Sequence, residues 1–189
     1  MYKTKVLLDD LYAQTEQFLE KAVQKWQNMP TESFYKKPSP TAWSAAQCLE
    51  HLNFYGRYYI PALEKAIAKA EQKRYQPTEN YASGWLGNYF YNLMLPNTEG
   101  GTKSKMKAPA NAIPAEQPDA RAMIAEFIDQ QEQMLQLIER ARKIHIGKVR
   151  VPISIVQWLK LKVGDTFLFM VAHHQRHILQ AERSLKLGE

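Results

Sequence analysis

Apolar residues recur at three- and four-residue steps along four stretches of the chain, and polar residues fill the positions between them. This spacing puts the apolar side chains on one face of an α-helix, so it predicts four long helices. We expect these helices to cover residues 4–28, 44–72, 119–143 and 164–187. Ser44 and Gln47 form the sequence pattern of a capping box, and Asp119 can cap the third helix.

The segments between the predicted helices have a different composition. Residues 75–118 are rich in Pro, Gly, Asn and Thr, which indicates a long crossover between the second and third helices. Within it, the aromatic segment 85–95 is compatible with a short helix. Residues 145–162 are expected to be irregular or to carry a short helix around 155–159. With so little strand pattern, the chain predicts an all-α fold, a four-helix bundle that forms a single domain over residues 1–189.

The charge balance brings nucleic acid into consideration as a partner. The formal net charge is +6 and the isoelectric point is about 9.3. The basic residues do not cluster, however, and the densest group is Lys103, Lys105 and Lys107 in the expected crossover. No nucleic-acid-binding signature accompanies them. A solvated basic surface is therefore the preferred interpretation, and nucleic-acid binding ranks last.

Membrane and export signals are missing from the sequence pattern. No stretch reaches the roughly 18 apolar residues of a membrane helix, and Asp9 and Asp10 interrupt the segment where a signal peptide needs an apolar run. Cys48 is the only cysteine, which excludes an intramolecular disulfide and suits a reducing compartment. We therefore expect a cytoplasmic protein with no membrane partner.

Three of the five histidines lie within one short stretch of the last predicted helix. His173 and His177 are four residues apart, so on a helix both imidazoles can point at one place. This spacing alone is weak evidence for a metal. His51 strengthens it, because His51 faces inward on the second helix and can supply a third ligand. His174 could replace His173 if the core face were rotated by about 100°.

The chemistry of three imidazoles narrows the kind of metal site. Three neutral imidazoles and a water make an open site, as in catalytic rather than structural zinc centres. Imidazole also binds nickel, iron and copper, so the residues do not select the metal. We predict that His51, His173 and His177 bind a divalent metal.

Several other side chains are candidates for supporting roles. Gln180 and Glu50 could orient the metal ligands, although Glu50 is equally compatible with a solvated helix position. Arg176 and Arg183 are expected at the surface, with contact to an anionic substrate as the alternative. The candidates for lining a pocket beside the metal are Trp85, Tyr55 and His174.

The order of these residues resembles the DinB-like superfamily. The resemblance rests on Trp43-Ser44, on Glu50-His51-Leu52, and on His173, His177 and Gln180 near the end of the chain. The stretch Lys105-Met-Lys-Ala-Pro109 is similar to one DinB-like subgroup. The resemblance covers the chain from the first predicted helix to the last.

The resemblance implies a bundle with up-down-down-up connectivity and a metal, usually zinc or nickel, held by His51, His173 and His177. It also implies a homodimer, and relatives that use bacillithiol, mycothiol or glutathione in transferase and isomerase reactions. The first hypothesis is thus a metal-dependent thiol S-transferase or hydrolase acting on a small molecule, with a low-molecular-weight thiol as possible cosubstrate. The alternative is a non-catalytic, stress-related module that binds a metal or a small ligand.

Overall fold

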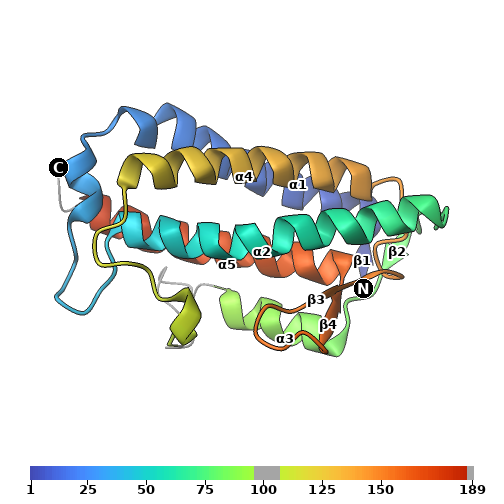
Figure 1. Ribbon diagram of the computed structural model, residues 1–189. Helices are drawn as coiled ribbons and strands as arrows, with labels where there is room; N and C mark the ends of the chain where they lie inside the picture. Colours follow the sequence, from blue (N-terminus) through green and yellow to red (C-terminus); the bar gives the residue numbers. More distant parts are fainter. Residues whose placement is uncertain (96–106, 187–189) are drawn as a thin grey trace.

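The computed structural model describes residues 1–95 and 107–186, and this part of the chain is mostly helical (Figure 1). Residues 96–106 and 187–189 lie outside the described part, and they include Lys103 and Lys105 of the basic group and the predicted end of the last helix. The helical class predicted from the sequence is confirmed. Four of the described helices are long: α1 (Thr4–Gln24), α2 (Ala45–Gln72), α4 (Ala120–Ala141) and α5 (Val163–Leu185).

The four long helices pack against one another and enclose the core. α2 lies against α4 and α5, and α1 also contacts both α4 and α5. Figure 1 shows α1 and α4 side by side above α2 and α5. The largest fully buried side chains come from all four helices and their connections, and include Leu11, Leu52, Phe127 and Phe167. The apolar stripes seen in the sequence therefore meet in one core.

Two helix starts follow the predicted capping chemistry. At the start of α2 the backbone N–H of Gln47 donates to Ser44 Oγ at 3.3 Å, and the Ser44 N–H donates to Gln47 Oε1 at 3.1 Å. At the start of α4 the N–H of Ala122 donates to Asp119 Oδ1 at 3.1 Å. Because each cap satisfies N–H groups that have no partner inside the helix, both boundaries were readable from local sequence.

The crossover between α2 and α4 is more structured than its composition suggests. Its Asn80–Tyr81 strand, β2, pairs antiparallel with β1 (Tyr2–Lys3) at the N-terminus. The expected short helix is present as α3 (Trp85–Met94), and it packs against α5. A 3-10 turn at Ala110–Ala112 follows, after the part that is not described. α3 thus covers one side of α5, below it in Figure 1.

The prediction for residues 145–162 was wrong in one respect. The segment forms a two-stranded antiparallel hairpin, β3 (Arg150–Pro152) with β4 (Lys160–Lys162), and residues 155–159 form its turn rather than a short helix. Val149, Val151 and Ile153 are all buried, whereas Arg150 between them is exposed. This alternation with β-branched residues is typical of a strand, and it was overlooked beside the stronger helical patterns.

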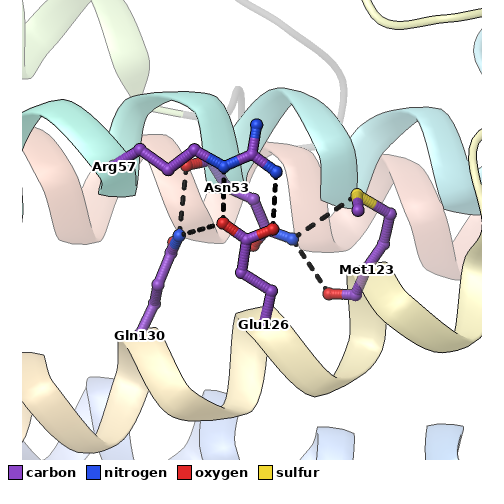
Figure 2. Close-up of polar contacts among 5 residues, drawn as sticks. All are labelled: Asn53, Arg57, Met123, Glu126 and Gln130. Atoms are coloured by element: carbon purple, nitrogen blue, oxygen red, sulfur yellow. Dashed lines mark hydrogen bonds and ion pairs between the residues drawn. The ribbon is translucent and has the colours of Figure 1, made fainter.

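A polar seam joins α2 to α4 on one side of the core (Figure 2). Gln130 on α4 donates to the Asn53 carbonyl at 3.1 Å and to Glu126 Oε1 at 3.0 Å. Arg57 on α2 makes two hydrogen bonds of 2.6 Å to the Glu126 carboxylate. A Cβ on Gly56 would lie only 1.8 Å from Gln130 Oε1, so the glycine permits this close approach of the two helices.

None of the described helices combines the length and the apolar character needed to span a membrane.

Candidate metal centre

Three histidines from two helices converge at one end of the packed helices. His51 comes from the second turn of α2, and His173 and His177 lie one turn apart on α5. Each histidine offers one ring nitrogen, and these nitrogens all lie within 4.8 Å of one another. All three side chains are at most 8% exposed. The packing of α2 against α5 therefore brings together residues 122 positions apart in sequence.

The spacing of the nitrogens suits a shared divalent ion. The Nε2 atoms of His51 and His173 are 3.2 Å apart. Two imidazole nitrogens bound to one tetrahedral zinc would be about 3.3–3.4 Å apart, given a zinc–nitrogen distance of about 2.0–2.1 Å. Three nitrogen donors without a carboxylate or thiolate form a set that zinc, nickel, iron or copper accepts. The residues present therefore fit a divalent transition metal.

Hydrogen bonds at the far side of two rings select the nitrogen that faces the centre. His51 Nδ1 lies 2.7 Å from the Ala112 carbonyl oxygen, and His177 Nδ1 lies 3.1 Å from Gln180 Oε1. Both oxygens accept a hydrogen bond, so each Nδ1 carries the proton and each Nε2 presents a lone pair. Such outer hydrogen bonds are the usual means of orienting metal-binding imidazoles.

His173 is held by ring packing rather than by a hydrogen bond at Nδ1. Its Nδ1 is buried and has no hydrogen-bond partner among the described residues. The ring stacks on Phe169 with a centroid distance of 5.6 Å and an interplanar angle of 9°. The Tyr55 ring packs edge-on against it, with a centroid distance of 4.7 Å. These aromatic contacts restrict the imidazole to an orientation in which Nε2 faces His51.

The surroundings keep the three imidazoles neutral. Burial lowers the pKa of His51, and it lowers the pKa values of His173 and His177 further. The positive charge of Arg176 adds to this effect on all three. A neutral imidazole is the form that binds a metal, so the pocket favours metal binding over protonation near neutral pH.

The histidines form part of the wall of a cavity of about 690 Å³. Trp43 also lines it, and the indole lies 4.8 Å from the His51 ring and 5.8 Å from the His177 ring. Tyr55 lines the cavity as well, and burial raises its pKa to about 12, which keeps the phenol protonated. The three histidines thus lie beside a cavity large enough for a small molecule, and aromatic rings pack against the imidazoles.

Gln180 contacts the His177 ring, the position from which it can orient that ligand. Glu50 instead contacts the backbone of another segment and none of the three histidines. The Glu50 carboxylate accepts a hydrogen bond of 2.6 Å from the Ala115 N–H, and Gln47 Nε2 donates to the Ala115 carbonyl at 3.0 Å. These two bonds hold the segment whose Ala112 carbonyl contacts His51. Glu50 can therefore influence His51 only through this segment.

The three candidates for lining the pocket have different positions. Tyr55 lines the cavity, but Trp85 at the start of α3 is 82% exposed and is not among the described residues that form the wall. His174 faces a neighbouring side of α5 and packs edge-on against Phe18 and Phe127. Trp85 and His174 are thus corrections to the sequence prediction. A change of one residue turns a helical side chain by about 100°, which moves His174 into the apolar core.

Sequence reasoning missed two contributors to the site. Trp43 entered the sequence analysis only as part of the family resemblance, and its contacts with His51 and His177 depend on the path of the loop before α2. The Ala112 carbonyl is a backbone group, so no side-chain pattern predicts its contact with His51.

Comparison with known proteins supports a family for the chain. The family model described as the DinB superfamily matches residues 12–181. No curated protein and no solved structure matches the chain.

Proposed function

Because the chain belongs to the DinB superfamily, we propose that it is a metal-dependent enzyme, a thiol S-transferase or a hydrolase, that acts on a small molecule. The single observation that carries the proposal is the convergence of three buried, neutral imidazoles on the wall of a 690 Å³ cavity. A structural metal has no need of such a cavity. The metal in this proposal is zinc or nickel, and a low-molecular-weight thiol is the cosubstrate.

The chemistry follows from the donor set and the open side of the site. A divalent ion held by His51, His173 and His177 would supply Lewis acidity, which lowers the pKa of a thiol or water or polarises an electrophile. The protein's own residues position the three rings, through Ala112 for His51 and through Gln180 for His177. Trp43 and Tyr55 exclude water from the faces of the rings, which strengthens electrostatic interactions inside the pocket.

We also propose the architecture, location and partners of the protein. These are a four-helix bundle with up-down-down-up connectivity, a single domain over residues 1–189, a homodimer, a cytoplasmic location and no nucleic-acid partner. The alternative of a non-catalytic module that binds a metal or ligand shares the histidine site. It differs in predicting no turnover of any thiol and electrophile pair.

Metal analysis of the purified protein is the first experiment. After dialysis against zinc or nickel, the native chain should retain one metal ion per chain, and His51→Ala should lose it. His174→Leu is the control, because His174 is also a buried histidine and lies on the helix that carries His173 and His177, but it packs against Phe18 and Phe127. Equal metal loss in the two variants, or no retention by the native chain, would overturn the three-histidine site.

An activity assay distinguishes the metal-dependent enzyme from the alternative of a non-catalytic module. Metal-loaded protein is incubated with bacillithiol, mycothiol or glutathione and a chromogenic electrophile, and hydrolysis is followed on ester and amide substrates. We expect turnover that a chelator removes and that zinc or nickel restores. A fully metal-loaded protein without turnover across this panel would favour the binding module.

A further inference from the structure

The charged side chains that the structure describes in the wall of the cavity beside the histidines are all positive. Among the described residues that line it, Lys107, Arg176 and Arg183 are cationic, and none is an aspartate or glutamate. Arg176, Gln180 and Arg183 follow one another at steps of four and three residues on α5. They therefore share the helix face that carries His173 and His177. A wall whose described charges are all positive attracts an anionic ligand and repels a cationic one.

Arg176 lines the cavity beside the histidines and comes one residue before His177 on α5. One guanidinium nitrogen, Nη1, donates to the Leu93 carbonyl of α3 at 3.1 Å. The crossover helix thus helps to position a positive charge beside the metal site.

A second, smaller chamber of about 80 Å³ is also lined by His173. Its walls are mainly aromatic and aliphatic and include Tyr59, Phe90, Ile153, Leu161 and Phe169. α3 supplies Phe90, and the β3–β4 hairpin supplies Ile153 and Leu161. An apolar cavity of about 150 Å³ can hold benzene. A chamber of about half that volume therefore suits a branched alkyl group of about three or four carbons.

The two chambers share part of their walls. Both are lined by His173, Tyr55, Met94, Pro109 and Lys107. A ligand that occupies both chambers therefore lies against these shared residues, which include one histidine of the candidate metal centre.

We propose that the site selects an amphiphilic small molecule, with an anionic group at Arg176 and a short branched alkyl group in the chamber of Phe90 and Ile153. This inference rests on the proposed function and adds the substrate class. The bond to be broken or formed lies between the two groups, beside His173. Neutral or purely polar molecules of the same length are poor ligands.

Binding of three matched probes tests the inference. The probes are 4-methylpentanoate, its uncharged amide, and acetate, which lacks the branched alkyl group. Dissociation constants are measured by calorimetry for the zinc-loaded and the zinc-free protein. The zinc-free protein is needed because a carboxylate can also contact the metal directly. In both forms, 4-methylpentanoate should bind about tenfold more tightly than the amide and than acetate.

Two variants assign the preferences to the two chambers. Arg176→Gln should weaken 4-methylpentanoate about tenfold more than it weakens the amide, whereas Arg150→Gln on β3, which does not line either chamber, should change neither. Ile155→Trp adds bulk to the wall of the smaller chamber at a residue that is 56% exposed, so the fold tolerates it. It should weaken 4-methylpentanoate but not acetate. Gln157→Trp in the same hairpin turn is its control.

The possible results separate the inference from the proposed function. Equal affinities for the acid and its amide, equal affinities for the acid and acetate, or no binding of any probe would each overturn the inference. Metal content, measured on the same samples, decides the histidine site independently. A protein that retains its metal and shows neither preference keeps the proposed function and loses this substrate class.

Discussion

His173 and His174 are neighbours in sequence, yet their imidazoles have opposite surroundings. His173 Nε2 lies 3.2 Å from His51 Nε2, whereas both nitrogens of His174 are buried without a hydrogen-bond partner among the described residues. Burial lowers the pKa of His174 to about 4, so it stays neutral as a core residue. The inward line of Met170, His173 and His177 was readable from helical spacing because the periodicity of a helix is fixed by its geometry.

Helical spacing predicts only one of the two hydrogen-bond partners that orient the imidazoles of His51 and His177. Gln180 follows His177 by three residues on the same helix, so its contact with Nδ1 was predictable. Ala112 reaches His51 from a distant loop through a backbone oxygen. The geometry of one helix determines the contact between Gln180 and His177, and the path of the crossover determines the contact between Ala112 and His51.

Gln180→Leu tests the orienting role at the residue scale. Losing the acceptor at His177 Nδ1 should weaken zinc affinity by about 10–100-fold, because the ring is then free to change tautomer and orientation. Affinity is measured by competition with a chromophoric chelator. Gln175→Leu, the same change on the same helix, is the control. Identical affinities of the two variants would show that Gln180 does not orient His177.

At the scale of elements, the buried carboxylate of Asp165 on α5 accepts hydrogen bonds from the crossover. Asp165, in the first turn of α5, accepts hydrogen bonds from Tyr81 Oη at 2.6 Å, from Ser83 Oγ at 2.5 Å and from the Gly84 N–H at 3.1 Å. Burial and the neighbouring Asp165 charge raise the pKa of Tyr81, which keeps it a donor. This cluster holds the start of α3 and thereby the helix that carries Phe90 and Met94 to the two chambers.

Asp165→Ala should detach α3 while the long helices remain folded. Three donors, of which Tyr81 is buried and Ser83 and Gly84 are partly buried, lose their acceptor, which should cost about 2–4 kcal/mol of unfolding free energy. Hydrogen exchange should quicken over residues 81–94, with little change in α2 and α4. Asp129→Ala, an exposed carboxylate on α4, is the control. Unchanged exchange over residues 81–94 would mean that other contacts suffice to hold α3.

The approach of α2 to α4 depends on Gly56. Gly56→Ala should destabilise the native chain by about 1–2 kcal/mol, because the new methyl group displaces Gln130 from its hydrogen bonds to Asn53 and Glu126. In a Gln130→Ala background the same substitution should stabilise by up to about 1 kcal/mol, the usual helix-propensity gain of alanine over glycine. Denaturant unfolding of the four proteins measures this coupling. The same sign in both backgrounds would refute the steric explanation.

At the scale of the whole molecule, the metal site connects two helices that are distant in sequence. His51 belongs to α2, and His173 and His177 belong to α5. An ion bound to all three stabilises only the folded chain, since the unfolded chain does not hold the ligands together. The site is therefore a link between the two halves of the core as well as a place for chemistry.

Zinc should raise global stability through this link. At a free concentration 100 times its dissociation constant, a ligand of the folded state adds about 2.7 kcal/mol. Chemical denaturation with and without zinc should show this gain in the native chain, and a chelator should remove it. His51→Ala should show no gain, whereas His174→Leu should retain it. An equal gain in His51→Ala would place zinc binding elsewhere.

The sequence by itself determined the helical class, the caps at Ser44 and Asp119, and the inward faces of His51, His173 and His177. These features depend on spacing of three and four residues and on hydrogen bonds within a helical turn, which act over short distances along the chain. The tertiary structure alone decided the β3–β4 hairpin, the Asp165 cluster, the Ala112 contact and the chambers beside His173. These features arise where segments far apart in sequence meet, and the packing of the whole core determines where they meet.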